Sequence, residues 1–347
     1  MNLVKNSFYQ YSFDELVKVL ESEGLSVSGA SLLFNWHYKQ KKTEPCTKNL
    51  AQSTQQFLKE HFLFDLPQIK DIHLSQDATV KFLMEMKDGL RVETVLIPFQ
   101  SKYTICLSTQ VGCAMKCSFC FTGTQGLKRH LATEEIVGQF IVADKWLQEN
   151  RPDDHKLKNI VFMGQGEPLH NFDAVKKSCE IFLDQHGTSI GIQKITVSTA
   201  GYLPGLERWK EEMPLVNIAL SFHSPFTEKR NKLIPINQRY PLSDVLNYLK
   251  SIPLQRKQYV IYEYLLIKDF NDGEEDAKAT AELLKDHQSI VNLIPFNPFP
   301  GSEYQRPEPE AVEKFQKIFS DYKIPALIRG TKGDDILAAC GQLNTKA

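Results

Sequence analysis

The feature that most constrains the fold of this chain is a regular alternation between short apolar runs and longer helical patterns, which begins near residue 104. The runs are rich in β-branched residues, as buried strands are, and segments 133–147 and 274–287 have the apolar spacing of helices. Six such alternations predict parallel βα units, which close most economically into an open or closed barrel. The six predicted strands are residues 104–109, 159–164, 194–199, 216–221, 258–266 and 291–296.

Polar or glycine-rich segments follow nearly every predicted strand. In chain order they read TQVGC, GQGEP, STAG, SFHS and PFNPFPG. In barrels built from βα units, the loops at the carboxyl ends of the strands hold the chemistry. We therefore expect the functional site at that edge of the sheet.

The chain before the alternation is predicted to begin with helices. Residues 12–62 read as helical, because Ser12 and Glu15 form the pattern of a capping box and apolar residues follow at helical spacing. Ser53 and Gln56 repeat the capping pattern further along. These signals predict a helical N-terminal domain.

A β-hairpin is predicted over residues 79–99, since apolar positions alternate on both sides of a turn at Asp88 and Gly89. At the other end of the chain, residues 322–343 predict one more strand and a cysteine-bearing tail. The chain thus divides into a helical domain, a hairpin linker, a βα core and a C-terminal extension. The predicted boundaries are residues 1–75, 76–100, 101–300 and 301–347.

Composition narrows the class of protein. Net charge is −1 and apolar content is 42%, which is ordinary for a soluble enzyme, and no apolar run reaches the roughly 18 residues of a membrane-spanning helix. The N-terminus lacks the apolar core of a signal peptide, so we expect a cytoplasmic protein. A reducing compartment disfavours a disulfide framework, and seven cysteines is an odd number. A nucleic-acid partner stays open, because three local basic segments are present: 36–42, 127–130 and 228–232.

Three of the seven cysteines, Cys113, Cys117 and Cys120, lie within eight residues just past the first predicted strand. Thiolates are the usual ligands of iron–sulfur clusters and of structural zinc. Zinc requires four closed ligands, and the chain has no second CxxC pair and no HxxxH. Three ligands suit a [4Fe–4S] cluster with one open iron, which can bind a small molecule and pass it an electron. The alternatives are coincidence or a zinc site completed by a distant residue.

With the aromatic Phe119 directly before Cys120, the segment resembles the CxxxCxxC signature of radical S-adenosylmethionine (SAM) enzymes. From the helical N-terminus to the ACGQL tail, the chain resembles the RlmN/Cfr family of RNA adenosine methyltransferases. It resembles the C2-methylating branch more than the C8-methylating, antibiotic-resistance branch. The resemblance implies an α/β fold, a partial (β/α)6 barrel with an N-terminal helical accessory domain that binds RNA.

The resemblance also implies two cofactors, a [4Fe–4S] cluster on the three cysteines and SAM. Taken alone, the GQGEP segment is equally compatible with a tight turn. Each of the other polar residues, taken alone, is compatible with a loop side chain whose hydrogen bonds are satisfied within the protein. The family pattern implies SAM contacts at Gly166, Glu167, Ser198, Ser221, Phe222, His223 and Asn297.

Two cysteines outside the cluster motif match further family positions. From residue type alone, Cys106 reads as a buried small hydrophobe, whereas Cys340 has small neighbours that leave it accessible. The resemblance implies that Cys340 carries an S-methylcysteine intermediate and that Cys106 is the resolving thiol. It implies that Glu93, which otherwise reads as a charged residue of an alternating strand, is a proton acceptor. Cys179 is predicted to lie in the core, and Cys46 has no predicted role.

The implied chemistry uses two SAM molecules per turnover, because the C2–H of adenine is not nucleophilic. One SAM methylates Cys340. The second binds the open iron and is cleaved to a 5′-deoxyadenosyl radical that takes hydrogen from this methyl group, and the methylene radical adds to the adenine. Cys106 or Glu93 accepts the ring proton, and Cys106 then ends in a disulfide with Cys340 as the RNA is released.

The implied substrate is adenosine 2503 of 23S rRNA, with adenosine 37 of tRNAs as a second target, and the implied electron donor is a flavodoxin or ferredoxin. No membrane partner is expected. The N-terminal domain offers a candidate aromatic and basic RNA surface. Its residues are Trp36, His37, Tyr38, Lys39, Lys41 and Lys42.

Three other functions remain open at the level of sequence: C8 methylation, RNA binding around a structural metal, and radical SAM chemistry on a protein or small molecule. The Cys106–Cys340 pair weighs against the last of these. Three positions hold residues that are not the common ones in the family: Gln165, Phe222 and Phe121. The segment before the tail also has fewer arginines than the family pattern.

Overall fold

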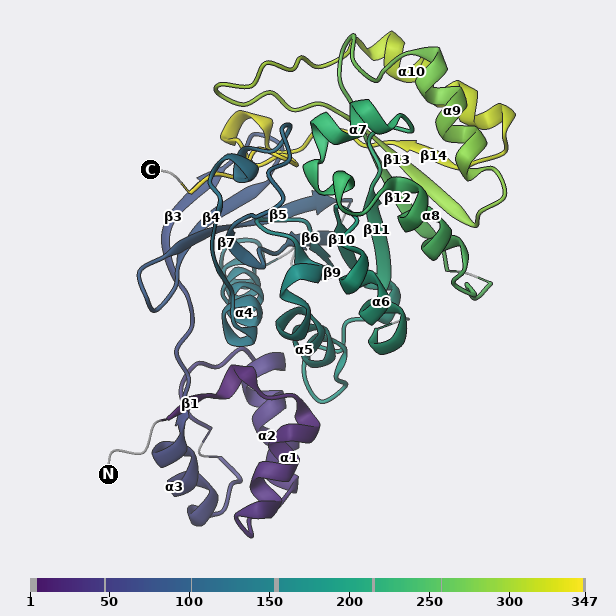
Figure 1. Cartoon of the computed structure of the whole chain (residues 1–347). Helices are drawn as coiled ribbons and strands as arrows, with labels where there is room; N and C mark the ends of the chain where they lie inside the picture. The colour runs from purple at the N-terminus through teal and green to yellow at the C-terminus, as the bar shows by residue number, and fades with distance from the viewer. Residues whose placement is uncertain are drawn as a thin grey trace.

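The structure, a computed structural model, describes residues 5–46, 48–100, 102–152, 156–213, 216–256 and 258–345. Its centre is one ten-stranded sheet with the strand order β14-β13-β12-β11-β10-β9-β6-β5-β4-β3 (Figure 1). From β6 to β14 neighbouring strands pair in parallel, and from β3 to β6 they pair antiparallel. Within the described residues no helix is long and apolar enough to cross a membrane.

All six predicted strands of the alternation are present, and the additional strand predicted in the tail is β14. The bounds are β6 (Lys102–Cys106), β9 (Leu157–Phe162), β10 (Ile195–Thr199), β11 (Asn217–Ser221), β12 (Val260–Leu266), β13 (Ser289–Pro295) and β14 (Ala326–Ile328). No pairing among the described residues joins the two edges of the sheet, so the barrel is open. The prediction of a partial βα barrel is therefore confirmed.

Helices connect the parallel strands and cover one face of the sheet (Figure 1). They are α4 (Thr133–Asn150), α5 (Phe172–Leu183), α6 (Leu203–Glu212), α7 (Thr227–Leu233), α8 (Leu242–Lys250), α9 (Glu274–Leu284) and α10 (Pro309–Asp321). Along β13, Val291 and Leu293 are fully buried, whereas Ile290 and Asn292, which alternate with them, are half-buried. Since side chains of a strand alternate between faces, one face of the sheet packs under helices and the other lines an open interior.

The predicted hairpin forms, and it continues the parallel sheet. Strands β4 (Val80–Glu85) and β5 (Arg91–Phe99) flank the turn, where Gly89 has φ of +82°. β3 (Gln68–Leu74) adds a third antiparallel strand. Val95 of β5 lies opposite Cys106 of β6, so the segment expected as a linker is hydrogen-bonded directly to the core. The domain boundaries themselves remain a proposal.

The N-terminal helices are α1 (Phe13–Ser22), α2 (Ser28–Phe34) and α3 (Gln52–His61), with a π-helical turn over Asn35–Lys39 and a short parallel pair of β1 (Asn6–Ser7) and β2 (Phe62–Leu63). The capping box predicted at Ser12 is confirmed, because Glu15 N donates to Ser12 Oγ at 3.3 Å and Ser12 N donates to Glu15 Oε2 at 3.0 Å. The one predicted at Ser53 is wrong, because α3 begins at Gln52 and Ser53 already lies inside the helix.

The N-terminal unit contacts the core at α4 and α5: the 3-10 turn Phe8–Gln10 packs against α4, and Glu15 of α1 pairs with Lys177 of α5 at 2.6 Å, where Figure 1 shows α1 and α2 beneath the core helices. The Phe13 ring stacks on His186 with ring centroids 4.0 Å apart. Lys41 Nζ lies 2.5 Å from Asp144 Oδ2, and both side chains are almost fully buried. The helical unit is therefore attached to the core by an apolar contact and a buried ion pair.

Candidate active site at the carboxyl ends of the parallel strands

The predicted site residues lie where the parallel strands end, and hydrogen bonds connect their loops. Ala200 N, just after β10, donates to Glu167 Oε2 in the loop after β9 at 2.8 Å. Asn297 Nδ2, just after β13, donates to Cys340 O of the tail at 3.2 Å. The structure therefore places the polar segments at one edge of the sheet, as their positions after the strands predict.

The loop that carries the three clustered cysteines is folded tightly on itself between β7 (Gln110–Gly112) and β8 (Leu127–His130). Gly112 has φ of +76°, and a Cβ there would lie 1.8 Å from Gly126 O. A Cβ on Gly123 would lie 2.7 Å from Cys117 O. Both contacts require glycine, because no side chain fits between backbone atoms at these distances.

The three thiols of this loop are unpaired and close to one another. Cys113 is buried, and Cys117 and Cys120 are half-buried. Met115 N donates to Cys113 Sγ at 3.5 Å, the kind of contact that tunes an iron–sulfur cluster. Burial is the main cause of the raised pKa of Cys117, and the nearby Cys120 and Cys113 raise it further.

The donor set fits a multi-iron cluster better than a single ion. Within the described residues, no three His, Cys, Asp or Glu side chains converge closely enough to hold one metal ion. A zinc site would need its ligands within about 2.3 Å of a common point. In a four-iron cluster each thiolate binds its own iron atom, so the sulfur atoms stand further apart while still facing one another. Cys113, Cys117 and Cys120 lie on one loop, and Cys120 and Cys113 are near enough to Cys117 to raise its pKa, as the thiol ligands of one cluster would be.

The GQGEP loop after β9 is shaped by close backbone contacts. Gly166 has φ of +103°, and a Cβ there would lie 2.6 Å from Gln110 Cβ. Glu167 is 3% exposed and accepts hydrogen bonds from Leu169 N at 3.2 Å and from Ala200 N. Burial raises the pKa of Glu167 to about 7. Its carboxyl group therefore joins two loops of the site as well as standing at a predicted SAM position.

Of the predicted SAM residues on β11, Ser221 is half-buried, whereas Phe222 is fully buried and stacks on Tyr264. The backbone of Phe222 is also engaged, because its N–H donates to Glu263 O and its carbonyl accepts from Arg230. His223 has φ of +56°, and its Nδ1 accepts from Leu265 N at 3.1 Å. Burial lowers the pKa of His223 to about 3, so the ring is neutral and its Nε2 carries the proton.

Cys106 and Cys340 lie close together at the inner face of the sheet. Cys106 is buried against Ala338 and Leu343 of the tail, whereas Cys340 is exposed. Burial is the main cause of the raised pKa of Cys106, and the neighbouring Cys340 raises it further. Although Cys340 is exposed as a residue, protein atoms surround its sulfur, and this desolvation raises the pKa of the thiol to about 11. Both are free thiols.

The tail that carries Cys340 is held by the cysteine loop and by β5. Phe121 N, directly after Cys120 in this loop, donates to Gly341 O at 2.7 Å. Glu93 Oε2 of β5 accepts from Asn344 N at 2.6 Å, and Glu93 Oε1 lies 2.9 Å from Lys81 Nζ. Burial raises the pKa of Glu93. Glu93 is therefore buried at the base of the tail and not solvent-facing, which was the alternative from residue type alone.

The sequence analysis missed Glu263, a carboxyl group on the interior face of β12. It is 7% exposed, and its Oε1 accepts from Asn292 Nδ2 at 2.8 Å. Burial raises its pKa to about 7. Glu263 is also the charged group that most raises the pKa of Cys340. The available signal was a single carboxylate inside an otherwise apolar strand, YEYLL.

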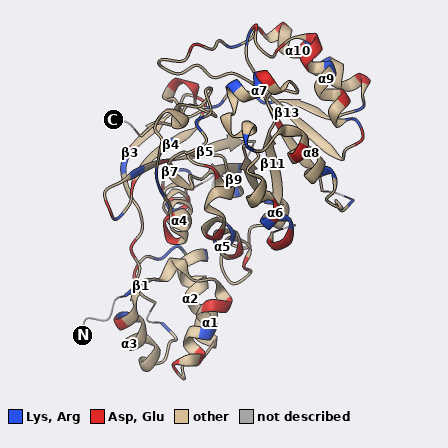
Figure 2. Ribbon diagram, in the orientation of Figure 1, with Lys and Arg blue, Asp and Glu red and all other residues tan. Residues whose placement is uncertain are grey.

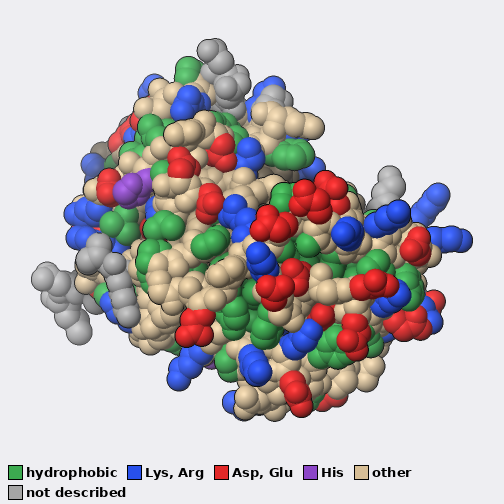
Figure 3. Space-filling view, turned by 90° about the horizontal axis from the view of Figure 1, so that it is seen from above, with side chains coloured by type: hydrophobic (Ala, Val, Ile, Leu, Met, Phe, Trp, Pro, Cys, Tyr) green, Lys and Arg blue, Asp and Glu red, His purple; other side chains and the backbone are tan. Residues whose placement is uncertain are grey.

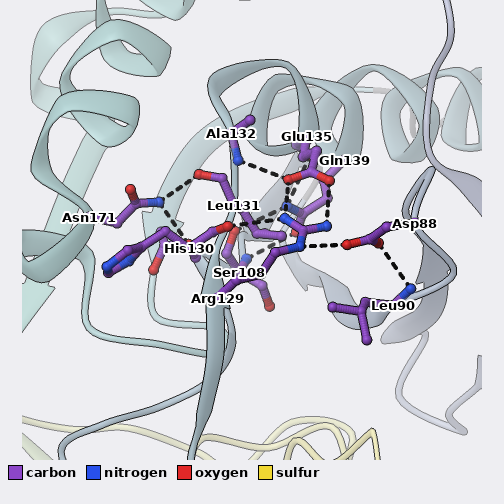
Figure 4. Close-up of polar contacts among 11 residues, drawn as sticks. Asp88, Leu90, Ser108, Arg129, His130, Leu131, Ala132, Glu135, Gln139 and Asn171 are labelled. Atoms are coloured by element: carbon purple, nitrogen blue, oxygen red, sulfur yellow. Dashed lines mark hydrogen bonds and ion pairs between the residues drawn. The ribbon is translucent and has the colours of Figure 1, made fainter.

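Polar contacts hold the chain just before and just after the cysteine loop (Figure 4). Arg129 of β8 donates to Glu135 at 2.7 and 2.8 Å and to Asp88 of the hairpin turn at 2.7 Å. Gln139 Nε2 donates to Ser108 O at 3.0 Å, and Ser108 N returns a bond to Gln139 Oε1. These contacts attach the chain around the loop to α4 and to the hairpin.

The predicted aromatic and basic RNA surface is wrong in its composition. His37 and Tyr38 are fully buried, and Lys41 pairs with Asp144. The π-helical turn directs these side chains into the N-terminal core, and of the predicted lysines Lys39 and Lys42 are exposed. Figure 2 shows acidic and basic positions interspersed along the ribbon of the N-terminal helices, and Figure 3 shows a similar mixture of charges on the opposite end of the molecule, seen from above.

Comparison with known proteins agrees with this geometry. The model of the radical SAM superfamily matches residues 107–284. A dual-specificity RNA methyltransferase RlmN from Bdellovibrio bacteriovorus is 39% identical over 340 residues, which cover 98% of this chain and 84% of the relative. An RlmN of the same description from Nitratiruptor is 40% identical over 332 residues, 92% of this chain and 93% of the relative.

A solved structure extends the similarity to the whole fold. The crystal structure of a radical SAM methyltransferase from Sphaerobacter thermophilus superposes with a TM-score of 0.90 at 34% identity. The match covers 97% of this chain and 99% of the other. The N-terminal helices, the sheet and the tail are therefore shared with that enzyme.

Proposed function

The chain belongs to the RlmN family of radical SAM RNA methyltransferases, and from this premise we propose that it methylates C2 of adenosine 2503 in 23S rRNA and C2 of adenosine 37 in tRNAs. The relatives are described as dual-specificity RNA methyltransferases, which supports two RNA substrates. The proposed course uses two SAM molecules per turnover, an S-methylcysteine and a transient protein–RNA crosslink.

The observation that carries this proposal is the position of Cys340 beside both Cys106 and the cysteine loop. Phe121 N, in that loop, donates to Gly341 O, and Cys340 lies close enough to Cys106 to raise the pKa of the Cys106 thiol. An enzyme that only cleaves SAM needs neither cysteine. A cysteine that carries a methyl group between SAM and RNA must be exposed and must lie near both the cluster site and a second thiol.

The cluster held by Cys113, Cys117 and Cys120 would supply, with SAM, the radical that activates the methyl group on Cys340. Cys340 presents this group to the adenine because its tail is bound by Asn297 and by the cysteine loop. The remaining steps are proton and thiol chemistry carried out by residues of the chain itself.

Glu93 is the better proton acceptor of the two candidates. The pKa of Cys106 is raised by burial, so Cys106 holds its proton near neutral pH and does not act as a base. Lys81 Nζ lies 2.9 Å from Glu93 Oε1 and favours the charged form of the Glu93 carboxyl group. Glu93 also accepts a hydrogen bond from Asn344 N in the tail that carries Cys340. The Cys106 sulfur then attacks the Cys340 sulfur, the bond between the Cys340 sulfur and the methylene carbon on the adenine breaks, and its electron pair with the proton released by Cys106 turns that carbon into the methyl group of the released RNA.

An anaerobic assay tests the proposal. The reconstituted protein is incubated with SAM, reduced flavodoxin or ferredoxin as electron donor, and unmodified 23S rRNA or tRNA, and the digested nucleosides are identified by mass spectrometry. We expect 2-methyladenosine from both RNAs. 8-Methyladenosine would move the protein to the resistance branch. If the protein still cleaves SAM but forms neither nucleoside, the proposed RNA substrate is wrong. If 2-methyladenosine is absent from the tRNA alone, the proposed dual specificity is wrong.

A further inference from the structure

Arg230, in the second half of α7, is a buried cation whose hydrogen bonds all go to uncharged oxygen atoms. It is 1% exposed. Its Nε donates to Asn237 Oδ1 at 2.9 Å, and Nη2 donates to Ala200 O at 3.0 Å. Nη1 donates to Ser221 O at 2.6 Å and also to Phe222 O. The guanidinium therefore fastens the carboxyl ends of β10 and β11, which carry predicted SAM contacts.

Hydrogen bonds alone do not account for a charge at this position. Across the ranges that the structure describes, no carboxylate forms an ion pair with Arg230. Burial lowers its pKa to about 9, so it remains protonated near pH 7. Burying an uncompensated ion costs on the order of several kcal/mol. An uncharged amide could bond to some of these carbonyl groups without that cost, so the charge itself needs an explanation.

The negative charge available to Arg230 is that of the cysteine loop. Cys117 is the group whose charge raises the pKa of Arg230 against the effect of burial. The loop and α7 are also in direct contact, because Ser118 N donates to Leu233 O at the end of α7 at 3.1 Å. Arg230 thus lies behind the strand ends, on an element bonded to the cluster loop.

We propose that Arg230 is a positioning residue whose buried positive charge offsets the negative charge of the cluster held by Cys113, Cys117 and Cys120 and so raises its reduction potential. The inference rests on the cluster that the proposed function requires. A cluster with three thiolate ligands is a net anion, and it gains one further negative charge when it takes an electron from the donor protein. A fixed cation nearby stabilises the reduced form more than the oxidised form.

The test separates charge from shape with matched variants. Arg230→Met removes the charge at similar length, Arg230→Lys keeps it, and Arg239→Met removes a charge from an exposed position of the same region. The midpoint potential of the reconstituted, SAM-free protein is measured by an EPR-monitored redox titration. We expect a more negative potential in Arg230→Met, with SAM cleavage at a fixed donor potential slower by about tenfold or more. Arg230→Lys and Arg239→Met should keep the potential of the unaltered protein.

A merely structural role predicts a different pattern. Asn237→Ala removes the partner of Arg230 Nε and leaves the charge in place, so it should lower thermal stability without moving the potential. An unchanged potential in Arg230→Met would overturn the proposal, as would a shift in Arg230→Lys of the same size as in Arg230→Met. Should the methionine variant fail to take up the cluster, Arg230→Gln replaces it as the uncharged variant.

The proposed function has its own readout in the same experiment. Iron and sulfide content and SAM cleavage by the unaltered protein report whether the cluster is present. If they are absent, the proposed function fails whatever Arg230 does. If they are present and the potential is insensitive to Arg230, only this inference fails.

Discussion

At the scale of single residues, the two cysteines outside the cluster loop differ in exposure although they are neighbours. Cys340 is exposed, as the methyl carrier of the proposed reaction has to be, whereas Cys106 is 6% exposed and packs against Ala338. A buried thiol with a raised pKa stays protonated and inert until a partner arrives next to it. This difference suits a carrier and a resolving thiol.

Replacing each cysteine should therefore stop the reaction at a different stage. We expect Cys340→Ala to abolish RNA methylation, because the methyl group has no carrier. Cys106→Ala should accumulate a covalent protein–RNA adduct, detected as a shifted band of labelled RNA on a denaturing gel. Cys179→Ala, at a buried position of α5, is the control: it should neither abolish RNA methylation nor accumulate the adduct, although it can lower stability. A fully active Cys106→Ala enzyme would contradict the scheme.

The buried carboxyl group of Glu263 predicts a pH dependence of stability. Its pKa rises from the ordinary 4.5 to about 7 on folding. Between these values the unfolded chain has lost the proton that the folded chain keeps, so the free energy of unfolding falls as pH rises. Glu263→Gln removes this loss and can keep the bond to Asn292. The variant should gain up to about 3 kcal/mol relative to the unaltered protein between pH 4.5 and pH 7.5.

Anaerobic denaturant titrations of the cluster-loaded protein at several pH values measure this difference. Glu167, whose pKa is also near 7, is present in both proteins and cancels in the comparison. Equal stability differences at pH 4.5 and 7.5 would show that Glu263 ionises normally in the folded chain.

Single residues were predictable where spacing carries chemistry. The C-x3-C-x2-C pattern predicts three ligands from donor type and spacing, and the structure places the three thiols on one loop, whereas their role as ligands stays a prediction. Glu263 and Arg230 were not predictable in this way, since each is one charged residue whose burial depends on tertiary packing. His37 and Tyr38 show the converse, because a polar aromatic residue beside lysines looks exposed until the turn of the helix is known.

At the scale of elements, the loop after β9 depends on a glycine in a conformation that other residues avoid. Gly166→Ala should cost about 2–3 kcal/mol or more, because φ of +103° is strained and the new methyl group would lie 2.6 Å from Gln110 Cβ. Gly89→Ala, at φ of +82° with nothing within 4 Å, should cost only about 1 kcal/mol. Thermal unfolding compares the two. SAM binding, measured by calorimetry, should fall in Gly166→Ala only; equal effects of the two substitutions would contradict a role for close contact.

The elements themselves were largely predictable from their periodicity, and their pairing was not. The hairpin over 79–99 follows from alternation around Asp88 and Gly89. That it would pair with β6, and so place Glu93 and Cys106 on one sheet, depends on a contact between β5 and β6 that no local pattern states. The false capping box at Ser53 has the same origin, because local capping signals do not determine where a helix begins.

At the scale of the whole molecule, the helical unit and the core act on one substrate only if they keep a fixed arrangement. The Lys41–Asp144 pair bridges them with both side chains almost fully buried. Breaking such a pair on one side leaves an uncompensated charge and costs about 3–5 kcal/mol, whereas replacing both partners with apolar residues is often neutral. The pair is therefore a point at which the arrangement can be altered without touching the site.

We expect Lys41→Met to loosen the helical unit, seen as faster hydrogen exchange in α1–α3 and in α4, and to weaken RNA binding while SAM cleavage without RNA is kept. The double variant Lys41→Met/Asp144→Leu should recover both exchange protection and RNA affinity, because the buried carboxylate that loses Lys41 in the single variant is then absent. Lys39→Met, at an exposed neighbouring position, removes the same charge without breaking the contact and is the matched control. If Lys39→Met and Lys41→Met weaken RNA binding equally and exchange is unchanged, the lysines act through charge on the RNA and not through the arrangement of the two units.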